Sequence, residues 1–168
     1  MTVWKTDRTW TYEHFPPSEA AENFPGVERL VKLWQSKRTV GNPAWSDFSL
    51  MDFDGFWGWL VVHDSVPGSP LCFDVRLFGT RIAEICNYDL SGQRICADDR
   101  PTSPDYVTIT ATDLEYYRFL LDEDRIGCGF GPFKRELGDL HTYSAIQLPL
   151  SRSGLINDQI LVIAQIVD

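Results

Sequence analysis

The stretch from 59 to 78 restricts the fold most, because it predicts two strands joined by a tight turn. Segment 59–65 is rich in β-branched and aromatic residues, and it ends at Val66-Pro67-Gly68-Ser69-Pro70, a sequence that favours a turn. In segment 71–78 the residues alternate with a period of two, the pattern of a strand that buries one face. The inward positions of that strand are Leu71, Phe73, Val75 and Leu77. Together the two segments predict an antiparallel hairpin.

The other periodic segments predict helices in the middle of the chain and strands at its end. An amphipathic stripe formed by Val27, Leu30, Val31 and Trp34 predicts a helix that precedes the hairpin. The predicted helices cover 27–38, 80–87 and about 104–121, although the start of the last one, at 107–110, equally suits a strand. The predicted strands cover 59–65, 71–78, 127–136, 141–150 and 159–167. This order predicts an α+β fold, with a five-stranded antiparallel sheet and its helices on one face.

The N-terminal segment 1–24 lacks a clear period and is interrupted by Pro16-Pro17. Its aromatic residues are costly to leave in water, so we expect an extended arm that docks on the domain or on a partner. With 168 residues, of which 43% are hydrophobic, the chain has the size of a single domain, and we expect that domain to span 25–168.

The charge balance and the lack of long apolar runs restrict partners and location. A net charge of -9 and scattered basic residues argue against a nucleic-acid partner. The polar N-terminus and the lack of an 18-residue apolar span predict a soluble protein with no membrane partner, and a cytoplasmic location as the default. None of the four cysteines forms a C-x-x-C pair, so we expect all of them to be reduced and mostly buried.

Three separated motifs resemble a family of single PAS-like domains of uncharacterised function. The first motif is the L-x-x-x-W-x-x-x-R segment from Leu30 to Arg38. The second is the strand, glycine turn and helix over 73–82, which continue to Asp89-Leu90-Ser91-Gly92. The third is Leu148-Pro149-Leu150-Ser151 before a closing apolar strand. The resemblance covers roughly 27–167 and implies a five-stranded PAS-like sheet preceded by an amphipathic helix.

That resemblance also implies a function class. PAS-like domains are sensory or protein-interaction modules, and the inner face of the sheet can enclose a ligand or simply pack shut. The helix before the first strand often mediates dimers, which implies a homodimer through 27–38. The ligand does not follow from the fold, because PAS domains bind haem, flavin, small acids or nothing.

The sequence argues against the familiar cofactors. A haem ligand is expected to be a histidine on the middle helix, but 104–124 contains none, and His63 and His141 are predicted to be hydrogen-bonded residues at strand ends. Cys86-Asn87 reverses the asparagine-cysteine order of the light-sensing flavin members. The acidic clusters 98–99 and 122–124 are typical of solvated loops and helix ends, so we predict no metal. The cofactor stays unknown.

The glycine-rich stretch Gly127-Cys128-Gly129-Phe130-Gly131-Pro132 allows a phosphate loop, a nucleophilic thiol or a flexible entry to a strand. We favour the flexible entry, because the spacing matches no phosphate-binding motif and no base is adjacent to the thiol in sequence. No G-x-S-x-G elbow is present. An enzyme of isomerase or hydrolase type is therefore the alternative reading, and a purely structural partner-binding module is a third.

The predicted ligand site is a cavity between the inner strand faces and the middle helices, apolar apart from a few orienting polar groups. Its strand walls are predicted to be Phe73, Val75, Ile146 and Leu148, and its helix walls Ile85, Tyr106 and Tyr117. The polar groups that can orient a ligand are Tyr106, Tyr117, Arg81 and Gln147. The opposing reading is that all of these residues are ordinary packing. The sequence thus predicts a PAS-like domain without catalytic activity of its own.

Overall fold

A computed structural model of the chain describes residues 1–7, 9–100, 109–134 and 140–167. The strands are β1 (Thr2–Asp7), β2 (Trp10–Phe15), β3 (Leu60–Val66), β4 (Cys72–Phe78), β5 (Arg94–Cys96), β6 (Ile126–Lys134), β7 (Leu140–Leu150) and β8 (Gln159–Val167). The helices are α1 (Glu28–Lys37), α2 (Thr80–Cys86) and α3 (Ala111–Asp122). Short 3-10 turns lie at Ala21–Asn23, Trp45–Asp47, Leu50–Phe53, Trp57–Trp59 and Ala97–Asp99.

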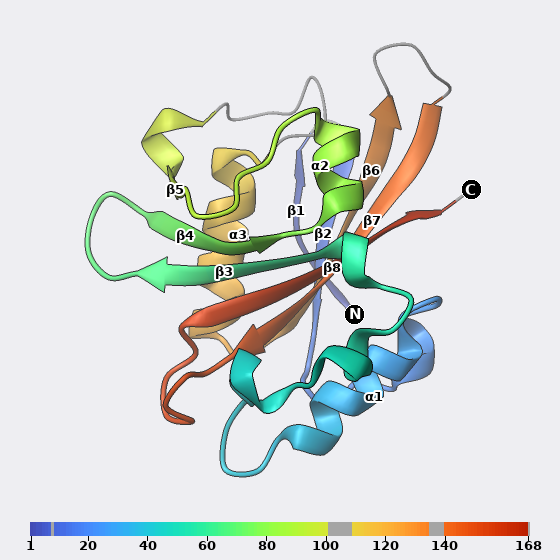
Figure 1. The fold of residues 1–168 in the computed structure, drawn as a ribbon, viewed down its shortest axis with the longest axis vertical. Coiled ribbons are helices and arrows are strands. Elements are labelled where there is room, and N and C mark those ends of the chain that lie inside the picture. Colours follow the sequence, from blue (N-terminus) through green and yellow to red (C-terminus); the bar gives the residue numbers. More distant parts are fainter. Residues whose placement is uncertain (8, 101–108, 135–139, 168) are drawn as a thin grey trace.

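The described strands form one antiparallel sheet in the order β1-β2-β6-β7-β8-β3-β4-β5 (Figure 1). The predicted α+β class is confirmed, but the sheet has eight strands where five were expected. The five predicted strands are all present, from β3 and β4 to the C-terminal three. The additional strands are β5, which is only three residues long, and the two strands of the N-terminal segment. That segment is extended, as predicted, but it pairs with β6 as part of the sheet.

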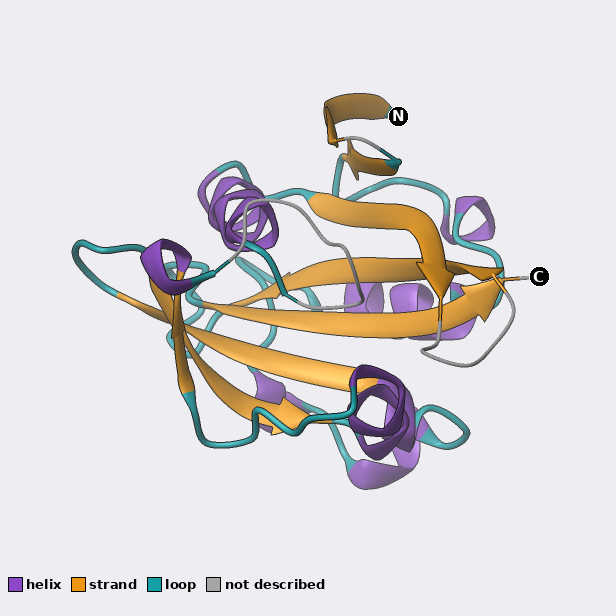
Figure 2. Cartoon of the chain, turned by 90° about the horizontal axis from the view of Figure 1, so that it is seen from above, coloured by secondary structure: helices purple, strands orange, loops and turns teal. Residues whose placement is uncertain are grey.

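Helices cover both faces of the sheet, whereas the sequence predicted helices on one face. Figure 2 shows the strands fanning out, with helices on more than one side of the sheet. On one face, α2 and α3 pack over the inward residues of β3, β4, β7 and β8. On the other, α1 buries Leu30, Val31 and Trp34. The indole Nε1 of Trp34 donates a hydrogen bond to the main-chain oxygen of Pro149, at 2.9 Å. The amphipathic stripe of α1 is therefore buried within its own domain.

Two boundaries differ from the sequence prediction. The amphipathic helix is present over Glu28–Lys37, but β1 and β2 precede it, so it is not the N-terminal element of the fold. The long middle helix begins at Ala111, and its capping box joins Thr110 to Asp113 instead of starting at Thr112. Thr112 and Glu115, which lie inside the helix, repeat the spacing of Thr110 and Asp113, and this repeat led the sequence prediction to the wrong capping box.

The expectation of four reduced cysteines is wrong, because Cys72 and Cys96 form a disulfide. These two residues are direct partners across β4 and β5, with Cα atoms 4.1 Å apart. That distance is short enough for a bridge, and only the pairing of β5 creates it. Cys86 and Cys128 are free and half-buried.

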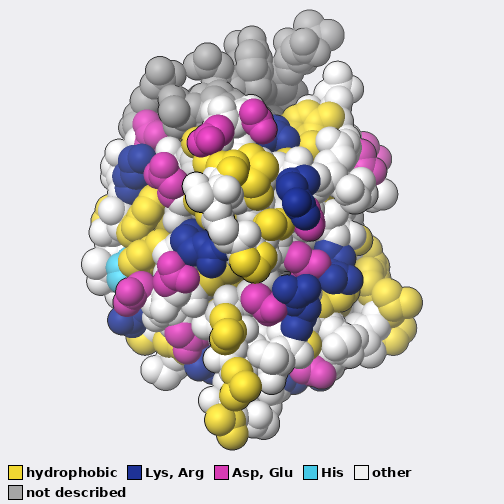
Figure 3. Space-filling model, turned by 90° about the vertical axis from the view of Figure 1, so that its left-hand side faces the viewer, with side chains coloured by type: hydrophobic (Ala, Val, Ile, Leu, Met, Phe, Trp, Pro, Cys, Tyr) yellow, Lys and Arg dark blue, Asp and Glu magenta, His cyan; other side chains and the backbone are white. Residues whose placement is uncertain are grey.

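The surface carries mixed charge. On the face drawn in Figure 3, basic and acidic side chains are interspersed with apolar ones. Several surface cations pair with carboxylates, such as Arg76 with Asp64 and Arg94 with Asp74. Within the described part of the chain, no helix is both long and apolar enough to cross a membrane.

Candidate functional site

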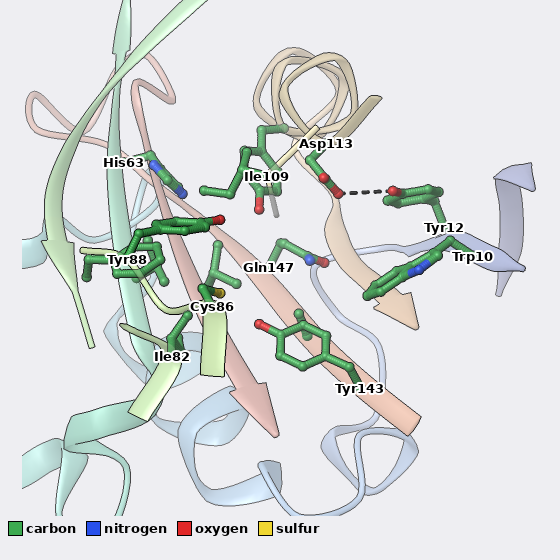
Figure 4. Close-up of a pocket in the computed structure, with 16 residues that line it drawn as sticks. Trp10, Tyr12, His63, Ile82, Cys86, Tyr88, Ile109, Asp113, Tyr143 and Gln147 are labelled. Carbon is green, nitrogen blue, oxygen red and sulfur yellow. Dashed lines mark hydrogen bonds between the residues drawn. The ribbon is translucent and has the colours of Figure 1, made fainter. Parts of the chain in front are cut away.

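A cavity of about 60 Å³ lies between helices α2 and α3 and the sheet, with the N-terminal strand β2 contributing to its wall (Figure 4). Its floor is formed by inward residues of three neighbouring strands, Val61, Val162 and Ala145. Its aromatic walls are formed by Trp10, Tyr12, Phe78, Tyr88, Tyr117 and Tyr143. The site therefore draws on segments from both ends of the chain.

Glycines on β6 make room for the aromatic wall. A Cβ atom on Gly131 would lie 2.5 Å from the indole of Trp10, and one on Gly127 would lie 2.7 Å from the hydroxyl of Tyr116. Both distances are shorter than any stable contact, so these positions accept no side chain without local movement. The glycine-rich stretch is thus neither a phosphate loop nor a flexible entry, because it is the strand β6 itself and its glycines admit neighbouring rings.

Three buried polar atoms at this site have no hydrogen-bond partner: both ring nitrogens of His63 and Oε1 of Gln147. His63 is 0% exposed and Gln147 is 3% exposed. His63 lies on β3 between β8 and β4, so the prediction of a hydrogen-bonded residue at a strand end is wrong. A buried polar group that loses its partners costs about 1–3 kcal/mol, and most native proteins avoid this cost. These atoms therefore have hydrogen-bonding capacity that no described residue uses.

The ionisation state of His63 follows from its burial. Burial lowers the pKa of its imidazole to about 3, against a small opposing effect of Asp64. Its ring packs on Tyr117 and Phe73, with centroid distances of 5.3 Å and 6.2 Å. At neutral pH the ring is uncharged, with one N–H donor and one nitrogen acceptor.

A half-buried acidic residue, Asp113, forms another part of the wall. It accepts hydrogen bonds from the main-chain N–H of Thr110 at 2.7 Å, from the hydroxyl of Thr110 at 2.8 Å and from Tyr12 Oη at 3.0 Å. Burial raises the pKa of Asp113 in spite of these donors. Because two of the three donors belong to the helix cap, this residue links the start of α3 to the aromatic wall.

The two free thiols are not activated. Burial raises the pKa of Cys86, which lines the cavity, and of Cys128, which lies on β6, to about 11 in each case. A nucleophilic cysteine needs a lowered pKa, so the thiol reading of the glycine-rich stretch finds no support here. Among the described residues, no group of three or more His, Cys, Asp or Glu side chains is placed to hold a metal ion.

The structure brings some of the sequence-predicted site residues together and separates others. Tyr117 and Gln147 line the cavity, and Phe73 and Val75 belong to the core cluster of the same face. Ile85 is half-buried beside that cluster, whereas Arg81 is exposed and pairs with Glu84. Tyr106 lies outside the described residues.

Ile146 and Leu148 face away from the cavity, into the core under α1. Adjacent residues of a strand point to opposite faces of the sheet, so Gln147 and its two neighbours cannot share a wall. The sequence reasoning missed Trp10, Tyr12, His63, Tyr88, Asp113 and Tyr143. The available signal was the aromatic N-terminal segment, which needed a partner surface, together with the alternate glycines of β6.

Comparisons with known proteins add little to this geometry. No family profile matches the chain, and no curated protein matches it. One similar solved structure, titled "Flavin Analogue Sheds Light on Light-Oxygen-Voltage Domain Mechanism", has a TM-score of 0.48 and 16% sequence identity, over 73% of this chain and 87% of that one. A likeness at this level does not identify a family or a ligand for this chain.

Proposed function

We propose that this protein is a PAS-like sensory or protein-interaction domain that binds a small molecule in the cavity between the sheet and helices α2 and α3, and that it has no catalytic activity of its own. The observation that carries the proposal is the set of unpartnered polar atoms on His63 and Gln147 inside an otherwise aromatic wall. Apolar side chains of similar size would avoid the cost of burying these atoms. Polar groups retained at such positions favour a binding site over a sealed core.

The proposal also fits the sequence motifs. The PAS-like pattern of strand, glycine turn and helix corresponds to β4 and α2, and Asn87 ends α2 in the left-handed conformation, with φ 59°. Asparagine tolerates that conformation better than most residues, so it can stand where the family often has glycine. The second glycine of the pattern, Gly92, also has a positive φ of 75°.

Haem and flavin do not fit the cavity with the side chains as placed. A dry cavity of about 150 Å³ is needed for one benzene ring, against about 60 Å³ here. Flavin has three fused rings and haem is larger still, so either would require the aromatic wall to move. The ligand we propose is smaller than either cofactor.

The alternative of a small isomerase or hydrolase requires titratable groups in contact with one another. Here Tyr12 and Asp113 are in contact, at 3.0 Å, but that carboxylate is also engaged by its helix cap, and the unpartnered nitrogens of His63 make no hydrogen bond to it. That separation favours the sensory proposal over the catalytic one.

The test is a thermal-shift screen of the purified protein against a metabolite panel, with native mass spectrometry of the same sample. We expect at least one small molecule to raise the melting temperature. We also expect Ala145→Val, which adds two methyl groups at the cavity floor, to abolish the response. Ile146→Val is the matched control, because the neighbouring residue faces the other core. An apo mass with no thermal shift across the panel would refute the proposal.

Homodimerisation is a separate part of the proposal and has a separate test. The stripe of α1 that suggested a dimer is buried against the sheet, so a dimer would have to use another surface. Val40, Leu50 and Met51, which follow α1 in the chain, are exposed apolar side chains and are candidates for that surface. A monomeric mass by light scattering at high micromolar concentration would remove the dimer and leave ligand binding intact.

A further inference from the structure

We infer that the cavity selects a small, planar, uncharged molecule that carries an N–H donor beside a hydrogen-bond acceptor, the pattern shared by short amides and azoles, and that it rejects anions. This inference rests on the proposed function, since it names the class of ligand for the same cavity. It follows from the hydrogen-bonding capacity, the charge and the size of the site.

The first step is the vacant acceptor on Gln147. The hydroxyl of Tyr116 lies on the same side of Gly127 as Gln147 Oε1, since both atoms lie 2.7 Å from the position of a Cβ on that glycine. That hydroxyl already donates its only proton to the main-chain oxygen of Glu13, and it accepts a bond from the N–H of Cys128 at 3.0 Å. Tyr116 therefore has no proton left for Gln147. A ligand must bring the donor, and an N–H group does so.

The second step is the pair of vacant atoms on His63. Because this imidazole is neutral, one of its nitrogens donates and the other accepts. Gln147 on β7 and Val61 on β3 both pair with Val162 of β8, and His63 follows Val61 by two positions. The backbones of β7 and β3 are thus two strand spacings apart, roughly 10 Å, and both side chains line the cavity space over the intervening strand β8. One small molecule with both a donor and an acceptor can engage either end of this space.

The third step is charge. Among the described residues, no lysine or arginine lines the cavity, and the one charged group in the wall is the carboxylate of Asp113. An anion would lose its hydration without gaining a cation, at a cost of several kcal/mol, and Asp113 would repel it. A cation is not required either, because Asp113 already accepts three hydrogen bonds. An uncharged ligand avoids both penalties.

The fourth step is size. The cavity volume of about 60 Å³ exceeds that of a single water site, which needs roughly 10–15 Å³, and falls short of a benzene site at about 150 Å³. A molecule of four or five heavy atoms is consistent with this range. Tyr117 and Tyr143 line the cavity, and aromatic rings offer flat surfaces on which a planar ligand can stack.

The experiment compares three molecules of nearly the same shape and different charge: acetamide, acetate and acetamidinium. Binding is followed by chemical-shift changes of the His63 ring and the Gln147 side-chain amide during NMR titrations at neutral pH, with pyrazole as an azole probe. We expect acetamide and pyrazole to bind with millimolar affinity, within the limit of about 1.5 kcal/mol per heavy atom for very small ligands. We expect acetate to bind at least about tenfold more weakly than acetamide, which is the effect of one lost hydrogen bond or more.

Variants assign the effect to the site. Gln147→Met keeps the length of the side chain and removes its vacant acceptor, so we expect acetamide to bind about tenfold more weakly. Gln165→Met makes the same chemical change on β8, where the amide donates to the main-chain oxygen of Pro25, and it should leave binding unchanged. If Gln147→Met does not fold, His63→Phe in the wild-type background provides the second test, with the same expected loss.

The outcomes separate the inference from the proposed function. If acetate or acetamidinium binds as tightly as acetamide, the ligand class is wrong, although the cavity still binds small molecules. If none of the probes shifts the two reporter groups while a larger molecule from the metabolite panel does, the inferred size and class are wrong. If no molecule of any kind binds, both the inference and the proposed function fail.

Discussion

Acidification tests the burial of His63 directly. The folded and unfolded states differ in how readily they protonate this residue. Burial lowers the pKa of the imidazole to about 3 in the folded protein, while an unfolded histidine has a pKa of about 6.5. Above the unfolded pKa neither state binds a proton, and the group has no effect on stability. As the pH falls below that value the unfolded chain takes up a proton and the folded chain does not, so stability is lost.

The size of this loss follows from the two pKa values. Between about pH 7 and pH 5 the proton bound by the unfolded state lowers the free energy of unfolding by about 2 kcal/mol, with a limiting slope of about 1.4 kcal/mol per pH unit. Tyr117 and Phe73, which pack on the ring, do not titrate in this range, because the first has a raised pKa and the second does not ionise. His63 therefore accounts for a loss that is large against a typical stability of 5–15 kcal/mol.

The assay is urea denaturation of the wild type and of His63→Phe at several pH values between about 5 and 7.5. Other groups titrate as well: burial lowers the pKa of His14 and raises that of Asp113, and these effects have opposite signs on acidification. Both groups remain in the variant, so they cancel in the difference between the two proteins. We expect the wild type to lose about 2 kcal/mol more than the variant over this range. Parallel pH profiles, or an NMR titration of the His63 ring with a midpoint near 6.5, would refute the reasoning.

Three further predictions follow from contacts in the two cores, each measured by chemical denaturation. Gly127→Ala should lower the free energy of unfolding by about 1–3 kcal/mol, because its Cβ would lie 2.4 Å from a buried leucine side chain. Gly129→Ala on the same strand and face, with its nearest contact at 3.6 Å, should be close to neutral. Equal losses of stability in the two variants would contradict this account. Tyr12→Phe should cost about 1–2 kcal/mol through the loss of its bond to Asp113, and no cost would mean that the bond is not formed. Trp34→Phe should cost about 2 kcal/mol through lost packing and an unpaired carbonyl, and a change below about 0.5 kcal/mol would show that the helix is not anchored there.

The parts of the fold that the sequence predicted are those with strong local periodicity. The hairpin β3–β4 and the strands β7 and β8 each carry an apolar pattern longer than five residues, and the stripe of α1 repeats at helical spacing. Which face of each element is buried then follows from the pattern alone, because only one strand register places the apolar face in the core. These elements were predicted within one or two residues of their ends.

The parts that were missed depend on contacts between distant segments. β5 is three residues long and carries no period of its own, so its pairing with β4, and the disulfide that this pairing allows, have no local signal. The aromatic residues of β2 indicated a surface in need of a partner but not which one. The sequence reasoning placed Gln147 and its two neighbours on one cavity wall. Only Gln147 lines the cavity, because adjacent residues of a strand point to opposite faces and Ile146 and Leu148 pack in the other core.

The N-terminal strands show why the cavity could not be read from the PAS-like motifs alone. The resemblance covers roughly 27–167, and a sheet built from those residues alone would leave β6 as an open edge. An exposed edge invites pairing with other chains, and β2 closes it. The same pairing places Trp10 and Tyr12 over the alternate glycines of β6, where they form the wall opposite His63. The pairing of β2 with β6 therefore both protects the sheet edge and completes the wall of the cavity, so Trp10 and Tyr12 belong to the proposed site as much as to the fold.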